Sequence, residues 1–170
     1  MTAQTEQGAC PLTASALSPE RIRELCNRGI AACRLGDWQQ GVDILYSVVG
    51  TAPTAREVPS LAFSYLGYGR AAQGAGYKDG LRLCKLAIRK DVFAAENYLN
   101  LARTCLLRDR RRMAIRALDR GLRVSPRHPQ LHKLRGRLGW RQRPALPFLD
   151  RSNAVNRALG KARLRLLRPR

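Results

Sequence analysis

The residues from Tyr98 to Pro126 constrain the fold most, because they contain two successive helical apolar faces followed by a stop signal. The first face recurs at the i, i+3, i+4, i+7 spacing of one side of a helix and consists of Tyr98, Leu101, Ala102 and Cys105. After a polar turn at 108–111, the second face consists of Ala114, Leu118 and Gly121. Pro126 has no backbone N–H to donate, so it ends the second helix. The segment predicts two antiparallel helices whose small residues let them approach closely.

This pattern resembles the tetratricopeptide repeat (TPR), which has a period of about 34 residues. The first helix of the pattern carries a large residue, a Leu, a small and a medium residue. The second helix carries a small, a large and a small residue and is followed by Pro. The residues on the eight signature positions are Tyr98, Leu101, Ala102, Cys105, Ala114, Leu118, Gly121 and Pro126. Cys105 stands where the family prefers an aromatic residue, and Gly121 where it prefers Ala. The chain is therefore similar to short TPR proteins of bacterial type.

Two earlier segments repeat the pattern. In the segment 58–92, Leu66 and Gly67 resemble the Leu-Gly pair of the repeat. In the segment 19–53, the turn Gly36-Asp37-Trp38 resembles the family's Gly-Asp-aromatic turn. About five extra residues around 54–59 separate these two units.

The resemblance implies an all-α fold, a right-handed helical solenoid of about three TPR helix pairs. The units are expected at about 19–53, 58–92 and 95–128, with a partial fourth at 129–143. A Pro-containing linker and a basic amphipathic helix in 144–170 are expected to cap the last repeat, since solenoid ends need capping. Residues 1–18 are polar and rich in small residues and are expected to form a disordered N-terminal tail, up to the helix start at Ser18 and Pro19.

Positive charge is concentrated in the C-terminal part. The net charge is +20, with 27 Arg and 5 Lys, but residues 1–100 carry only +2 and residues 101–170 carry +18. A basic surface attracts acidic or phosphate-rich partners through salt-sensitive electrostatics, although arginines on a solvated helix face give the same composition. The predicted basic patch consists of Arg112, Arg116, Arg120, Arg123, Arg127, Arg157, Lys161 and Arg165. An Asp119–Arg123 pair is expected to soften it slightly.

No motif indicates catalysis, a cofactor or a metal. Gly67-x-Gly69-x-x-Ala72 resembles a dinucleotide fingerprint, but the glycines lie in a helical pattern without the required preceding strand. His128 and His132 have no nearby Cys or carboxylate to complete a metal site. Cys26 and Cys33 lie on one helix face without a neighbouring general base. We therefore expect a protein that is not an enzyme and has no cofactor.

The five cysteines show no C-x-x-C spacing, and the first 20 residues lack a basic region followed by an apolar run. No stretch approaches the roughly 18 to 20 apolar residues of a membrane span. These features favour reduced thiols and a cytoplasmic location.

By resemblance to the family, a partner peptide would lie in the concave groove formed by the first helix of each pair. The groove residues expected on this basis are Arg34, Ser64, Tyr68, Glu96, Leu99, Arg103 and Leu106. Cys26 and Ile30 replace the Lys and Asn by which some members clamp a carboxylate, which disfavours a co-chaperone role. Leu99→Glu or Tyr68→Ala is predicted to abolish partner binding without unfolding.

The leading hypothesis is a non-enzymatic protein–protein interaction module, a scaffold or adaptor. The alternative is a nucleic-acid or ribosome-associated protein that uses the arginine-rich C-terminal part, although only Trp140 and Phe148 follow Tyr98 as aromatic residues for base stacking. Two further alternatives are a basic helix lying on an anionic membrane surface and a small secretion chaperone. The oligomeric state is left open.

Overall fold

The computed structural model describes residues 18–52, 54–139, 155, 158 and 159. Seven α-helices and no strand occur in the continuous part of this range. In chain order they are α1 (Pro19–Leu35), α2 (Trp38–Thr51), α3 (Ser60–Ala72), α4 (Tyr77–Lys90), α5 (Ala95–Leu106), α6 (Arg111–Val124) and α7 (Pro129–Arg137). The protein is all-α, as the sequence predicts.

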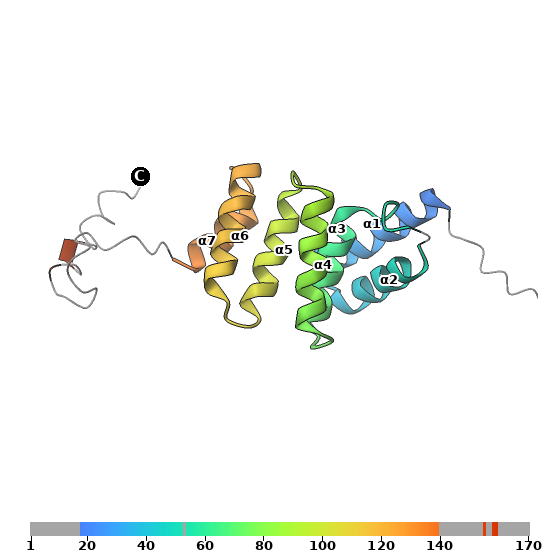
Figure 1. Ribbon diagram of the computed structural model, residues 1–170, viewed down its shortest axis with the longest axis horizontal. Helices are drawn as coiled ribbons and strands as arrows, with labels where there is room; N and C mark the ends of the chain where they lie inside the picture. The colour runs from blue at the N-terminus through green and yellow to red at the C-terminus, as the bar shows by residue number, and fades with distance from the viewer. Residues whose placement is uncertain (1–17, 53, 140–154, 156–157, 160–170) are drawn as a thin grey trace, which may run out of the picture.

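The helices form successive pairs that stack along the long axis of the molecule (Figure 1). The pairs are α1–α2, α3–α4 and α5–α6, and α7 packs on α6. Contacts between pairs run through α3, which touches α1, α2 and α5, and through α5, which also touches α4. This nearest-neighbour packing is the architecture of a helical solenoid.

Local sequence signals set the helix ends. The Ser18 hydroxyl accepts a hydrogen bond from the Arg21 amide at 3.3 Å, and Pro19 follows at the first helical position. Gly36 ends α1 with a φ of 102°, a left-handed conformation that glycine adopts without strain. The Asp37 carboxylate then caps α2 through the Gln40 amide at 3.0 Å. A two-residue turn between α1 and α2 results.

The turn before α6 is shifted by one residue from the predicted one. We expected 108–111, but Arg111 already belongs to α6 and Leu107 belongs to the loop. The reason is that the Arg110 carbonyl accepts hydrogen bonds from the amides of Met113 and Ala114, at 3.0 and 3.1 Å, and these bonds begin the helix.

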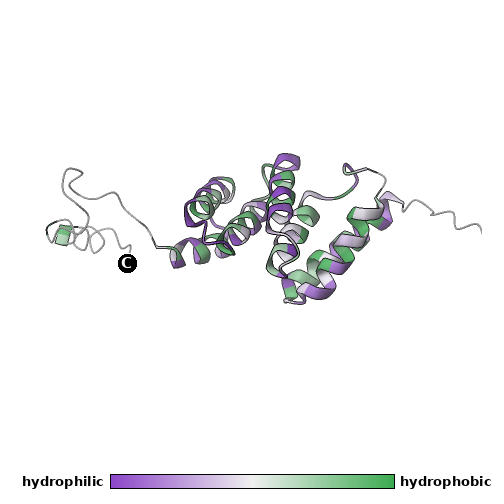
Figure 2. Cartoon of the chain, turned by 60° about the horizontal axis from the view of Figure 1, so that its bottom comes forward, coloured by the Kyte–Doolittle hydropathy of each residue, from purple (hydrophilic) through white to green (hydrophobic). Residues whose placement is uncertain are grey.

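The buried side chains form two core clusters, and each helix carries both hydrophobic and hydrophilic residues (Figure 2). One cluster joins α1, α2 and α3 and includes Ile22, Leu45 and Leu66. The other joins α5, α6 and α7 and includes Leu118 and Leu131. The repeat signature accounts for much of this second core, since Ala102, Cys105, Ala114 and Leu118 belong to it, and Tyr98 is also buried.

Two helices approach each other closely at a glycine-to-glycine contact between α3 and α4. A Cβ on Gly67 would lie 2.6 Å from the Gly80 carbonyl oxygen, and a Cβ on Gly80 would lie 2.3 Å from the Gly67 carbonyl oxygen. Only glycine leaves room for backbone to pack directly on backbone here. The resemblance of Gly67 to the Leu-Gly pair therefore has a direct packing reason.

Most of the predicted N-terminal tail, C-terminal linker and capping helix lie outside the described residues. Of the expected apolar face of the capping helix, Val155, Ala158 and Leu159 are described; they are helical and their side chains are exposed. The capping role stays a prediction.

Candidate functional site

A cavity of about 280 Å³ opens on the face formed by the first helices. We call it the first-helix pocket. Its lining residues come from α1, α2, α3, α5 and α7 and the α1–α2 turn, and they are Cys33, Arg34, Gly36, Trp38, Tyr65, Tyr68, Arg103 and Gln130. Residues more than 90 positions apart in the sequence therefore meet at one place on the solenoid.

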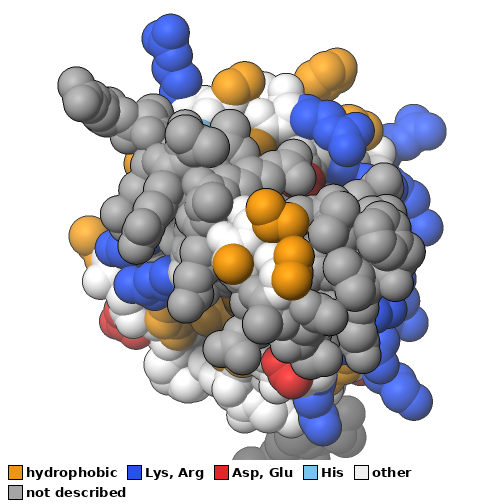
Figure 3. Space-filling view, turned by 90° about the vertical axis from the view of Figure 1, so that its left-hand side faces the viewer, with side chains coloured by type: hydrophobic (Ala, Val, Ile, Leu, Met, Phe, Trp, Pro, Cys, Tyr) orange, Lys and Arg blue, Asp and Glu red, His pale blue; other side chains and the backbone are white. Residues whose placement is uncertain are grey.

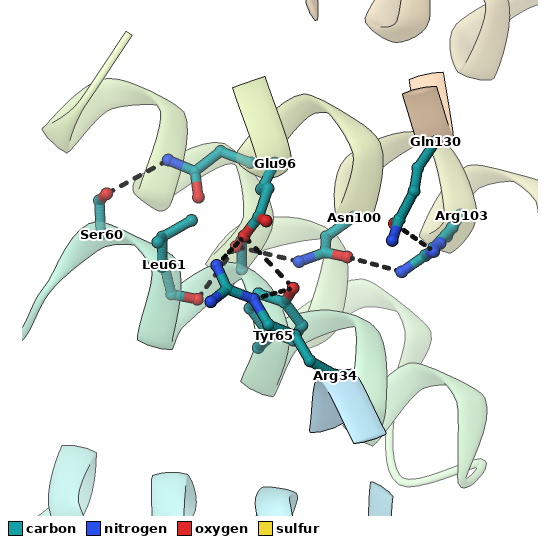
Figure 4. A network of polar contacts seen from close by, with 10 residues as sticks. Arg34, Ser60, Leu61, Tyr65, Glu96, Asn100, Arg103 and Gln130 are labelled. Atoms are coloured by element: carbon teal, nitrogen blue, oxygen red, sulfur yellow. Dashed lines mark hydrogen bonds and ion pairs between the residues drawn. The ribbon is translucent and has the colours of Figure 1, made fainter. Parts of the chain in front are cut away.

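An ion pair crosses one side of this pocket (Figure 4). The Arg34 Nη2 atom lies 2.7 Å from the Glu96 Oε2 atom, which joins α1 to α5. The Tyr65 hydroxyl of α3 accepts from Arg34 Nε at 3.3 Å and donates to Glu96 Oε2 at 3.3 Å. The hydrogen bond to Glu96 raises the pKa of Arg34, and burial raises the pKa of the Tyr65 hydroxyl. Both groups therefore keep their protons, and the charge of Arg34 is neutralised by Glu96.

Arg103 occupies the other side of the pocket and is held only by neutral groups. Its Nη1 donates to Asn100 Oδ1 at 3.4 Å, and its Nη2 donates to Gln130 Oε1 of α7 at 3.1 Å (Figure 4). Within the part of the chain that the structure describes, no carboxylate pairs with it. The pocket therefore contains one cation whose charge is not compensated.

Aromatic rings form the wall between these two arginines. The Trp38 ring lies 4.9 Å from the Tyr68 ring, edge to face, and 6.0 Å from the Tyr65 ring. The Arg103 guanidinium carbon lies 5.8 Å from the centre of the Tyr68 ring. Aromatic rings beside a cation provide apolar contact and orient the charge. This arrangement can hold an apolar or aromatic side chain next to a carboxylate.

The structure brings three of the predicted groove residues into the first-helix pocket, namely Arg34, Tyr68 and Arg103. Glu96 lies beside it through the ion pair to Arg34. Leu106 is partly buried and packs against the second core cluster. The other two predicted groove residues, Ser64 and Leu99, are buried.

Ser64 and Leu99 are 0% and 1% exposed, so neither can contact a partner on this surface. Ser64 is turned into the α3–α5 contact, where its hydroxyl accepts from Asn100 Nδ2 at 3.2 Å and donates to the Leu61 carbonyl at 3.0 Å. Leu99 belongs to the second core cluster. We therefore expect Leu99→Glu to destabilise the fold instead of sparing it, because it would bury an unpaired carboxylate.

Five pocket residues are absent from the predicted groove: Cys33, Gly36, Trp38, Tyr65 and Gln130. Trp38 was placed only in a turn, although it directly begins α2. Tyr65 follows the buried Ser64 by one position, and it is not one of the positions at which the repeat family contacts a peptide. The concentration of aromatic residues in 63–77 was the one available signal.

No protein-family model matches the chain, and no curated protein matches it either. Solved structures match it strongly. The first TPR of Spaghetti (RPAP3), bound to an HSP90 peptide, superposes with a TM-score of 0.57 at 10% identity, covering 73% of this chain and 94% of that one. The Arabidopsis OM64 TPR domain gives 0.57 at 14% identity, covering 71% and 95%.

The protein has a tetratricopeptide-repeat fold. The Thermobaculum terrenum O-GlcNAc transferase also superposes on these TPR helices, with a TM-score of 0.57 at 22% identity. The match covers 69% of this chain but only 22% of the transferase.

Five arginines of the predicted basic patch, four on α6 and one in the turn after it, lie on the outer surface of the TPR solenoid. Arg112, Arg116, Arg120, Arg123 and Arg127 are all exposed. Basic side chains line the right-hand edge of the view towards the α7 end of the molecule (Figure 3). The other predicted members, Arg157, Lys161 and Arg165, lie outside the described residues.

Asp119 does not pair with Arg123 as predicted. Its Oδ1 atom lies 2.8 Å from Nε of Arg135, a largely buried arginine of α7. A side chain on the next helix therefore binds this carboxylate, and no ion pair of Arg123 occurs among the described residues.

The residues considered for metal and cofactor chemistry have structural roles in the TPR helices. His128 caps α7 through the Leu131 amide at 3.4 Å, and His132 contacts the Pro126 carbonyl. No cluster of three His, Cys, Asp or Glu suited to a metal occurs in the described part of the chain. Gly67 and Gly69 lie inside α3, whereas a dinucleotide fingerprint requires its glycines in a turn between a strand and a helix.

The four cysteines that the structure describes are free and buried. Burial raises the pKa of Cys26 and of Cys33 to about 11, and that of Cys84 to about 12. These thiols are therefore protonated at neutral pH and are poor nucleophiles. Among the described helices, none is both long and apolar enough to cross a membrane.

Proposed function

We propose that this protein is a non-enzymatic TPR interaction module that holds an extended segment of a partner protein in its first-helix pocket. The segment presents an apolar or aromatic side chain to the ring wall of Trp38 and Tyr68 and a carboxylate to Arg103. The uncompensated charge of Arg103 inside an aromatic pocket is the observation that carries this proposal.

The energetics of such a pocket support the proposal. Aromatic and arginine side chains dominate binding energy at protein interfaces, because they bury a large area with little conformational freedom. Arg34 is already paired with Glu96, so an incoming carboxylate would gain more from Arg103. The peptide seen on the RPAP3 domain is consistent with a TPR surface of this size holding a peptide.

Two further features support a binding role over a catalytic one. The described thiols are protonated, and the described histidines are engaged with backbone groups of α7 and of the turn before it, so a nucleophile and a base are not brought together. Free buried thiols also fit a reducing compartment, and we propose a cytoplasmic location on that basis.

The test is an affinity capture from native lysate with the full chain as bait, in which partners are identified and then quantified against variants. Tyr68→Ala and Arg103→Met are each expected to reduce capture of a partner at least tenfold, while thermal melts show a folded protein. Matched controls come from outside the pocket: Tyr46→Ala, a tyrosine 57% exposed on α2, and Arg123→Met on α6.

Partners that the pocket holds are lost with the first pair of variants and kept with the controls. The proposal fails if every captured partner binds the Tyr68→Ala and Arg103→Met proteins as well as it binds the controls. Nuclease treatment of the lysate separates the nucleic-acid alternative, since partners bridged by nucleic acid disappear with nuclease and with salt.

A further inference from the structure

A second hollow lies on a different face of the solenoid from the first-helix pocket. It is a groove of about 420 Å³ lined by α4, α5 and α6. We call it the second-helix groove. Figure 1 shows α5 running between α4 and α6, so α5 forms the floor and the two second helices form the walls.

The floor of the second-helix groove is apolar. Ile88 of α4, Leu101 of α5 and Met113 of α6 line it, and each is partly exposed. Ile88 belongs to neither core cluster, so its side chain contributes to this surface more than to the core. Methionine on such a floor adapts its shape to different apolar side chains.

The rim of the groove is entirely basic. Arg89 and Lys85 stand on the α4 wall, and Arg116 and Arg120 stand on the α6 wall. All four are exposed, no acidic residue lines the groove, and none of the four forms an ion pair within the described chain. The nearest carboxylate on α6, Asp119, is taken by Arg135.

An apolar floor between two cationic walls defines the chemistry of its occupant. Apolar side chains gain from covering Ile88 and Met113, and carboxylates on both flanks gain from the arginines. Two helical walls with a helical floor favour a helix as the occupant, because side-chain ridges pack into the grooves between helices.

We propose that the second-helix groove binds an acidic amphipathic helix of a partner protein. The apolar face of this helix lies on Ile88, Leu101 and Met113, and its Asp or Glu side chains pair with Arg89, Arg116 and Arg120. The site is separate from the first-helix pocket, so the protein can hold two segments at once and act as an adaptor.

Nucleic acid fits this groove less well. Phosphates would gain from the rim but would leave the apolar floor without a matching group. The aromatic ring that reaches the groove is that of Tyr98, which is 5% exposed and cannot stack on a base. The basic C-terminal segment of the chain itself would be repelled by the rim.

The experiment is a selection from a display library of 16-residue peptides on the full chain, depleted on the double variant Ile88→Gln/Arg116→Glu. We expect enriched peptides to carry apolar residues at helical spacing flanked by Asp or Glu. The proposal is overturned if no peptide is enriched, or if the enriched peptides lack acidic residues.

Fluorescence polarisation then measures the best peptide on single variants. Arg116→Glu and Ile88→Gln are each expected to weaken binding at least about tenfold, as loss of a central interface contact does. Arg123→Glu carries the same charge change on the same helix outside the groove, and it is expected to weaken binding less than about threefold, because it acts only through long-range, salt-screened electrostatics. Equal losses for Arg116→Glu and Arg123→Glu overturn the proposal.

A 12-nucleotide single-stranded RNA serves as the competing probe. If the RNA binds more tightly than the selected peptide and is insensitive to Ile88→Gln, the groove is a phosphate surface and the proposal is overturned. A Tyr68→Ala protein should bind the selected peptide normally, which separates this site from the first-helix pocket.

Discussion

Arg34 at the end of α1 reaches across α3 to Glu96 at the start of α5, with 2.7 Å between Nη2 and Oε2. The two residues are 62 positions apart, and the Tyr65 hydroxyl of the intervening helix bonds to both. This contact links the first helix pair of the solenoid to the third. It also fixes one wall of the first-helix pocket before any partner arrives.

The stability contributed by this ion pair is expected to be small. The Arg34 and Glu96 side chains are 50% and 27% exposed, so solvent screens their attraction. A double-mutant cycle with Arg34→Met and Glu96→Gln should give a coupling energy of about 0.5 to 1 kcal/mol in urea unfolding. A coupling energy near zero would show that the contact adds nothing to the free energy of unfolding.

The Gly67–Gly80 contact predicts that adding one methyl group at this contact lowers the stability of the protein. Gly67→Ala should lower the free energy of unfolding by about 1 to 3 kcal/mol, because α3 and α4 must move apart to admit the Cβ. Gly50→Ala in α2 is the matched control, since a Cβ there meets nothing within 4 Å.

The control variant should be neutral or more stable by up to about 1 kcal/mol, because alanine favours helix more than glycine does. Chemical denaturation measures both variants. Equal stability of Gly67→Ala and Gly50→Ala would contradict the close approach of the two helices.

Substitutions at Leu99 and Tyr68 should differ in their effect on stability, although the sequence predicts both residues to line the groove. Leu99→Glu should destabilise the protein by at least about 4 kcal/mol, since it buries a carboxylate without a partner. Tyr68→Ala should cost only about 1 kcal/mol, from lost contact with the Trp38 ring. Thermal melts followed by circular dichroism would show the difference, and a fully folded Leu99→Glu protein would refute the burial of this side chain.

The buried thiols predict a loss of stability in alkaline solution. The unfolded chain releases thiol protons near pH 9, whereas Cys26 and Cys33 keep theirs until about pH 11 in the folded protein. Between these values the unfolded state binds fewer protons, so the free energy of unfolding falls as pH rises, by up to about 1.4 kcal/mol per pH unit for each thiol.

Urea unfolding at pH 8, 9, 10 and 11 measures this slope. The free energy of unfolding of Cys26→Ala should fall less steeply with pH than that of the wild-type protein, even if the variant is less stable at pH 8. An unchanged slope would mean that the Cys26 thiolate is not penalised by burial.

Helix periodicity and the repeat signature were sufficient to predict the all-α solenoid, because they report which residues each helix buries. Ala102, Ala114 and Leu118 lie where the pattern puts them, in the second core cluster. The start of α1 at Ser18 and Pro19 also followed from capping chemistry.

The candidate site was only partly predictable, because spacing along one helix does not say how far the next helix covers it. Leu99 keeps the expected groove register but is buried within the second core. Gln130 reaches the first-helix pocket only because α7 packs beside α5 and α6. Asp119 pairs with Arg135 for the same reason, since α7 packs on α6.

The position of Trp38 gives the protein an internal optical probe. Its indole ring forms part of the first-helix pocket wall, within 4.9 Å of the Tyr68 ring, and the chain contains one other tryptophan, Trp140. A Trp140→Phe protein would leave a single tryptophan, whose emission responds when a ligand displaces water from that wall. Occupancy of the pocket could then be followed in an unlabelled protein, with any candidate partner, before that partner's binding segment is known.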